Sequence, residues 1–161
     1  MAQQGAAKAA VVNTQILMRD SDAAKSIGPQ IQKLQTDYQQ TVNSEQQELR
    51  QMQAKLNDER ATLTPEVVQQ RTQELEQKYQ SYQRSVQQHR VEWENGARNA
   101  AQKITAAIVQ IVEGIEKEQK LGMVFERSAL IGTTTATDIT PEVLKRLNQR
   151  LPSVTVELPK Q

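Results

Sequence analysis

The sequence predicts an α+β protein, mostly α, in which a long antiparallel coiled-coil hairpin projects from a small β-rich oligomerisation body. Two long polar stretches carry apolar residues at steps of three and four, the spacing of one helix face. Between them, the motif Thr-Pro-Glu-Val at residues 64–67 restarts a helix. Both ends of the chain instead carry short apolar runs of the kind found in β-strands.

The composition favours long solvated helices over a compact core. Of the 161 residues, only 3% are aromatic, with one Phe and one Trp, and glutamine is abundant. The 20 basic and 19 acidic residues leave a net charge of +1. Without a Lys/Arg block, nucleic acid is not an expected partner, and the near-neutral charge also argues against contact with anionic lipid.

Two features of the sequence indicate the compartment of the protein. Cysteine is absent, which suits an oxidising environment, and the opening residues MAQQGAAKAA fit a mature N-terminus with an initiator Met restored. We therefore expect a mature form from which a signal peptide has been removed.

The first strand and the first long helix follow in order. Residues 9–13, AAVVN, form a short apolar run that predicts a strand. From about Ser21 the pattern becomes helical over about 40 residues, with Gly28-Pro29 marking a kink or a false start. The apolar stripe of this helix consists of Ile27, Ile31, Leu34, Tyr38, Val42, Leu49, Met52, Leu56 and Leu63.

The second helix begins after Thr64. A threonine oxygen can accept from first-turn N–H groups, Pro65 suits the first helical position, and Glu66 suits the positive end of the helix dipole. The helix is expected to end near Gln119. Its apolar positions are Val68, Leu75, Tyr79, Tyr82, Val86, His89, Trp93, Ala97, Ala100, Ile104, Ile108, Ile111 and Ile115. Since each stripe is too narrow to be buried alone, residues 21–119 should pair as a hairpin whose tip lies near 61–67.

Residues 1–20 and 120–161 are predicted to form the small body. Strands are expected at 121–127 and 129–133, and Thr140 should cap a short helix over 141–149. Residues 154–158 alternate apolar and polar side chains, as an edge strand or a tail would.

Such a small body has too few elements for an independent core. The absence of Cys and the single His leave neither disulfides nor a metal to stabilise it, so we expect oligomerisation. The residues assigned to the oligomerisation body are Val11, Val12, Met123, Val124, Phe125, Leu130 and Ile131.

Three segments carry a family resemblance. The sequences AVVN at 10–13, LGMVFERSALIG at 121–132 and DITPEVLKRLN at 138–148, with a long hairpin between them, resemble the Skp/OmpH-like periplasmic chaperones over residues 9–150. The resemblance implies a periplasmic homotrimer whose bodies associate through β-strands and whose three hairpins surround a cavity. It also implies that unfolded outer-membrane β-barrel proteins are held in this cavity without ATP. We expect no cofactor.

The candidates for client contact lie near the hairpin tip, because frayed helix ends expose apolar atoms more readily than helix middles. They are Met52, Leu56, Leu63, Val67 and Val68.

Other conspicuous side chains have simpler interpretations. His89 could sense pH or bind a metal, but a lone polar seam residue more often sets the helix register. Trp93, Tyr79 and Tyr82 are interpreted as packing residues. Glu92 and Glu94, among Arg90 and Arg98, are interpreted as a solvated face.

No catalytic constellation is recognisable, since the chain has no Cys, one His and no Gly-rich phosphate loop. We therefore expect neither an enzyme nor a metal site. The leading hypothesis is an ATP-independent holdase that prevents aggregation of unfolded outer-membrane proteins. The alternative is a structural coiled-coil spacer or adaptor that binds a folded partner at its arm tips.

Overall fold

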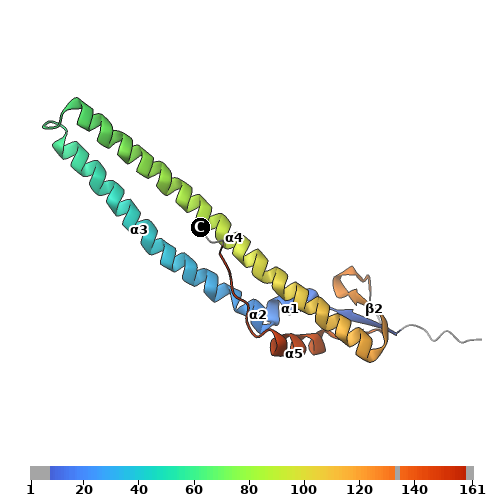
Figure 1. The fold of residues 1–161 in the computed structure, drawn as a ribbon. Coiled ribbons are helices and arrows are strands. Elements are labelled where there is room, and N and C mark those ends of the chain that lie inside the picture. Colours follow the sequence, from blue (N-terminus) through green and yellow to red (C-terminus); the bar gives the residue numbers. More distant parts are fainter. Residues whose placement is uncertain (1–7, 133–134, 159–161) are drawn as a thin grey trace, which may run out of the picture. The chain divides into compact units, whose positions relative to one another are not determined.

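The computed structural model describes residues 8–132 and 135–158. The helices are α1 (Thr14–Asp20), α2 (Asp22–Lys25), α3 (Ile27–Glu59), α4 (Pro65–Gln119) and α5 (Thr140–Arg150) (Figure 1). The strands are β1 (Lys8–Val12), β2 (Leu121–Glu126) and β3 (Thr137–Asp138), and a 3₁₀ helix covers Arg127–Ala129. Long helices with a small three-stranded sheet confirm the predicted fold class.

The chain divides into two compact units by its internal contacts. Of the described residues, 8–30, 96–132 and 135–157 form one unit, here called the body unit, and 31–95 with 158 form the other, the arm unit. The predicted division at residues 20/21 and 119/120 remains a prediction.

In the arm unit, α3 and α4 are joined by a short turn at the tip. The Glu59 carbonyl accepts the N–H groups of Thr62 at 2.9 Å and Leu63 at 3.2 Å, which ends α3. Thr64 then accepts the Val67 N–H on its Oγ1 at 3.4 Å, and Pro65 opens α4. This arrangement places the Thr64 hydroxyl over the first turn, where unpaired N–H groups need acceptors.

The body unit is built around a parallel sheet of order β2-β1-β3. Ala10, Val11 and Val12 of the central strand are buried, as expected for a parallel strand covered on both faces. From α4 the unit receives a stripe of buried residues at steps of four and three, and α1 and α5 contribute fully buried Leu17, Val143 and Leu147. The α4 stripe consists of Ala100, Ile104, Ile108, Ile111 and Ile115.

The chain between β1 and α3 differs from the prediction. Residues 14–20 form α1, which was not predicted. The helix expected from about Ser21 is divided, since α2 ends at Lys25 and α3 begins at Ile27. Asn13 Oδ1 accepts the Ile16 N–H at 3.2 Å, and Ser21 Oγ accepts the Ala24 N–H at 3.3 Å. Asn13 and Ser21 are therefore the N-caps of α1 and α2. An N-cap residue has a non-helical backbone, so a new helix begins after each of them.

The predicted strand at 129–133 is wrong within its described residues. Arg127–Ala129 forms a 3₁₀ helix, closed by a bond from the Leu130 N–H to the Arg127 carbonyl at 3.2 Å. Gly132 has a φ of 108°, which takes the backbone out of the extended region. The third strand is instead the two-residue β3, and residue 133 lies outside the described residues.

The prediction that Thr140 caps α5 is also wrong. Ile139 occupies the N-cap position without a side-chain bond, and Thr140 is the first helical residue. Thr140 Oγ1 accepts the Asn13 N–H at 2.9 Å, while Asp138 Oδ1 accepts the Thr140 N–H at 2.9 Å. The threonine hydroxyl is therefore used to tie α5 to the end of β1, and Asp138 supplies the acceptor for the helix start.

Asp138 should make the stability of the body unit sensitive to acid. The hydrogen bond from Thr140 and, to a smaller extent, the charge of Arg127 lower the pKa of Asp138. A lowered pKa means that the stabilisation is present above the unfolded-state pKa of about 4 and is lost as the pH falls through the folded-state value. Because the carboxylate is about half exposed, we expect less than about 1 kcal/mol.

Urea unfolding of the wild type and of Asp138→Asn between pH 3 and pH 7 measures this contribution. The free-energy difference between the two proteins should be largest at neutral pH and shrink below about pH 4. A difference that stays constant over the whole range would contradict the assignment.

Candidate binding surfaces

The five residues predicted to contact a client near the tip are not strongly exposed. Leu56 is buried in the arm unit, and Met52, Leu63, Val67 and Val68 are half-buried. Met52 lines a small hollow of about 200 Å³ together with the polar side chains of Lys55, Arg71 and Glu74. The tip thus offers partly covered apolar atoms with charged neighbours, and its role in client binding remains a prediction.

A larger groove lies on the arm unit between α3 and α4. Its volume is about 920 Å³, and Leu49, Ala54 and Leu75 contribute apolar atoms to its lining. The rings of Tyr79 and Tyr82 have centroids 6.5 Å apart, and Tyr79 is 52% exposed. The remaining lining residues are Gln46, Arg50, Gln53, Asn57, Glu76 and Gln80.

The groove combines two kinds of contact chemistry. Tyrosine rings present a large apolar face with a polar tip, and amide side chains both donate and accept hydrogen bonds. Such a lining can bind many sequences, since neither group demands one particular partner. The sequence interpretation treated Tyr79 and Tyr82 as packing residues. Their i, i+3 spacing within a glutamine-rich helix was the available signal for a shared surface.

The interior of the arm unit is less apolar than predicted. On α3, Val42, Leu49 and Leu56 are buried at intervals of seven residues. On α4, the predicted seam positions Tyr79 and Val86 are wrong, since both are exposed. The half-buried Ser85 makes a contact across the hairpin instead, with its Oγ 3.3 Å from the Tyr38 hydroxyl.

A polar and aromatic cluster fills the hairpin interior further along α4. Glu92 is only 7% exposed, so its assignment to a solvated face is wrong. Its carboxylate lies 3.0 Å from His89 Nδ1 and accepts the Gln88 amide at 2.9 Å. The Tyr38 ring packs on His89 and Trp93, with centroid distances of 4.2 and 5.4 Å. These pairings explain why a carboxylate is tolerated there.

Glu45 on α3 is a second acidic residue of the hairpin interior. Its Oε2 is buried and has no hydrogen-bond partner. Glu45 lies between the buried residues Val42 and Leu49 and lines a pocket with Lys78 and Tyr82. A buried acceptor without a partner costs free energy, so this position weakens the hairpin.

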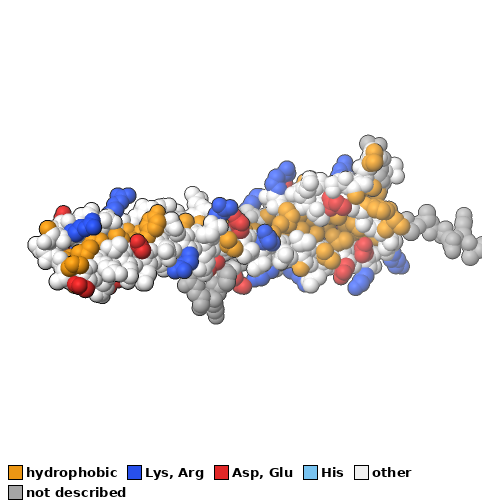
Figure 2. All heavy atoms as spheres, turned by 90° about the horizontal axis from the view of Figure 1, so that it is seen from above, with side chains coloured by type: hydrophobic (Ala, Val, Ile, Leu, Met, Phe, Trp, Pro, Cys, Tyr) orange, Lys and Arg blue, Asp and Glu red, His pale blue; other side chains and the backbone are white. Residues whose placement is uncertain are grey.

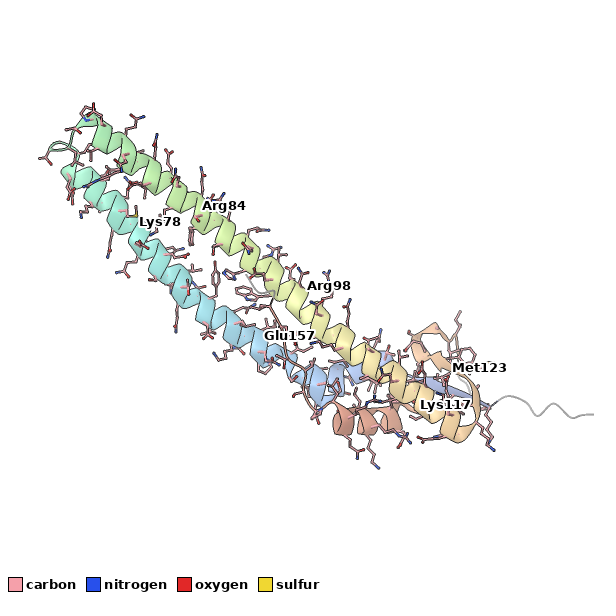
Figure 3. All side chains as sticks on the ribbon, in the orientation of Figure 1. Lys78, Arg84, Arg98, Lys117, Met123 and Glu157 are labelled. Carbon is pink, nitrogen blue, oxygen red and sulfur yellow. The ribbon has the colours of Figure 1, made fainter. Side chains whose placement is uncertain are left out.

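Charges along the arm unit are mixed in sign. Lys78 pairs with Glu48 across the two helices, Arg71 pairs with Glu59, and Arg90 pairs with Glu94 at 3.3 Å on α4. Lys78 and Arg84, both on α4, are labelled in Figure 3. Within the ranges 8–132 and 135–158, no group of three His, Cys, Asp or Glu residues is placed to bind a metal ion.

The body unit presents an apolar edge. Of the residues assigned to the oligomerisation body, Val11 and Val12 are buried, and Val124 and Leu130 are half-buried. Met123, Phe125 and Ile131 are exposed. In Figure 2, hydrophobic side chains gather over the end that carries β2. β2 is the outer strand beside β1, and among the described residues no strand pairs with its other side.

Comparison with known proteins identifies the class to which this fold belongs. The model of a family described as outer membrane protein (OmpH-like) matches residues 8–147. The match covers most of the chain, so the protein belongs to the OmpH-like family. No helix among the residues described is long and apolar enough to cross a membrane.

One solved structure is similar over the whole chain. It is a crystal structure from Caulobacter crescentus CB15 of a protein assigned provisionally as an outer membrane chaperone (OmpH-like). The TM-score is 0.83 at 17% sequence identity, and the match covers 100% of this chain and 98% of that chain. At this identity the similarity establishes the fold alone. Among curated protein sequences no match was found.

Proposed function

We propose that this protein is an ATP-independent holdase chaperone of the periplasm. It binds unfolded outer-membrane β-barrel proteins between the helical arms of a homotrimer and prevents their aggregation, without catalysing a reaction. The observation that carries the proposal is the family match over residues 8–147, which spans both the sheet and the hairpin. The chaperone assignment of the structural neighbour supports the same class of function.

The arm grooves supply the client contacts in this proposal. Each groove offers two tyrosines, several amides and a few apolar side chains, so each contact with an unfolded chain is weak and tolerant of sequence. Several such grooves around one client raise the effective concentration of each contact, which gives tight binding without one large patch. The client leaves when it folds into the membrane and withdraws its apolar side chains.

The β2 edge supplies the contact between subunits. Met123 and Phe125 lie on the exposed face of an outer strand, and burial of exposed apolar area on this small body would stabilise it. Association through the body leaves the arm helices free to surround a client.

The alternative, a rigid spacer that binds a folded partner, is less well supported by the arm interior. A spacer gains from a well-filled apolar seam, whereas this hairpin contains Glu45, Glu92 and His89. Polar interior positions lower the cost of bending and opening the hairpin.

Light scattering after dilution of a urea-unfolded outer-membrane β-barrel protein tests the proposal. Without ATP, increasing amounts of this protein should suppress scattering until it saturates. Tyr79→Ser should weaken the suppression, and Val109→Ala, an exposed change on the same helix, should not. Undiminished scattering in the presence of folded oligomer would contradict the holdase function and favour the spacer.

A further inference from the structure

The segment after α5 is extended and has one buried face. Val154 and Val156 are 5% and 8% exposed, whereas Thr155 and Glu157 are exposed. This alternation is that of a β-strand, but the described residues 151–158 pair with no strand. The family match ends at residue 147, so the segment lies outside the part of the chain that defines the family.

Two side chains, Ser26 between α2 and α3 and Gln30 in the first turn of α3, take the place of a neighbouring strand. The Gln30 amide donates from Nε2 to the Val154 carbonyl at 2.8 Å and accepts the Val156 N–H on Oε1 at 3.0 Å. Ser26 Oγ accepts the Val154 N–H at 3.1 Å. On the other side, Lys103 of α4 pairs with Glu157 at 3.0 Å (Figure 3 labels Glu157).

These contacts recognise the backbone of the segment. Gln30 and Ser26 bind only main-chain N–H and C=O groups, which every residue except proline can offer. The side-chain requirement is limited to two apolar residues separated by one exposed residue. A site with these contacts therefore accepts an extended chain with alternating apolar residues, whatever its exact sequence.

We propose that the surface on which residues 153–157 lie is a binding site for extended client segments, and that these residues are its internal occupant. Ser26 and Gln30 bind the backbone in this site, and the places that Val154 and Val156 fill accept the apolar side chains. The site is here called the tail site. The inference rests on the proposed function for the source of the ligand. Strands of outer-membrane barrels alternate apolar and polar residues, which is the pattern that the tail itself presents.

Because the tail occupies the site, an external segment can bind only when the tail has left it. The tail remains attached through α5, so it competes at high effective concentration with any segment from outside. The apparent affinity for an external segment falls in proportion to the fraction of molecules whose site is open. A client that presents many alternating segments at once can displace the tail, whereas a single short segment competes poorly.

Fluorescence anisotropy with a labelled peptide of the sequence of residues 152–158 tests this inference in the full-length chain. The variant Val154→Ser/Val156→Ser should release the tail and bind the peptide about tenfold more tightly than the wild type, if the wild-type site is open about a tenth of the time. Adding Gln30→Leu should remove the gain. A peptide in which Thr155 and Val156 are exchanged, so that the valines are adjacent, should not bind preferentially.

Hydrogen exchange of the wild type provides a second measurement that needs no variant. Saturating peptide should increase the exchange of the Val154 and Val156 amides, because the displaced tail loses its acceptors on Ser26 and Gln30. Equal peptide affinity of the wild type and the tail-released variant, or bound peptide with unchanged protection of these amides, would overturn the tail site.

The outcomes separate this inference from the holdase function. Suppressed client aggregation without any gain in peptide affinity overturns the tail site and leaves the holdase function standing. A gain in peptide affinity that Gln30→Leu removes, without suppression of aggregation, supports the tail site and contradicts the holdase function.

Discussion

Replacement of Leu147 by alanine is expected to lower the free energy of unfolding of the body unit by about 2–5 kcal/mol. Leu147 on α5 is fully buried, as are Leu17 on α1 and Ile104 on α4. Truncation loses the transfer free energy of the side chain and leaves a cavity that close-packed neighbours fill only in part. Since whole domains are stable by only about 5–15 kcal/mol, this is a large share of the stability of a small body.

Urea unfolding followed by circular dichroism at a fixed protein concentration measures the effect. The fixed concentration matters because association stabilises the folded state by mass action. Val109→Ala is the matched control, since Val109 is exposed on a helix of the same unit and should change the free energy by less than about 0.5 kcal/mol. Equal losses in the two variants would contradict the assigned core.

Replacement of Glu45 by leucine is expected to stabilise the arm unit by about 1–3 kcal/mol. The wild-type carboxylate keeps Oε2 buried without a hydrogen-bond partner, and leucine removes that unpaired acceptor. The new side chain would also join the buried stripe between Val42 and Leu49. We expect this gain in stability only because the Glu45 carboxylate is partly buried in the hairpin. The same change at an exposed acidic residue should give no gain.

Thermal unfolding of Glu45→Leu and Glu48→Leu compares the interior position with an outer one. Glu48 is half exposed and pairs with Lys78, so leucine there should give no gain. An unchanged or lower midpoint for Glu45→Leu would contradict the account of the hairpin interior.

The sequence allowed the architecture to be predicted because apolar spacing and turn residues were sufficient for it. The seven-residue interval of Val42, Leu49 and Leu56 marks the α3 seam, and Thr64-Pro65 marks the start of α4. The strands β1 and β2 lay within one residue of their predicted ends for the same reason. These features depend on local sequence alone.

The predictions that were wrong concern residues whose positions depend on partners distant in sequence or on polar pairing. Thr140 has the local pattern of a cap, but its hydroxyl binds the Asn13 N–H, 127 residues away. Glu92 is polar, and only its bonds to His89 and Gln88 make its burial possible. A search for apolar periodicity therefore assigned Val86 to the seam and Glu92 to the surface.

The most direct test of the central claim is native mass spectrometry of the protein mixed with an unfolded outer-membrane β-barrel protein in the absence of ATP. The account predicts a complex whose mass equals a homotrimer plus one client. A population of client-free oligomer only, with the client recovered as aggregate, would contradict it.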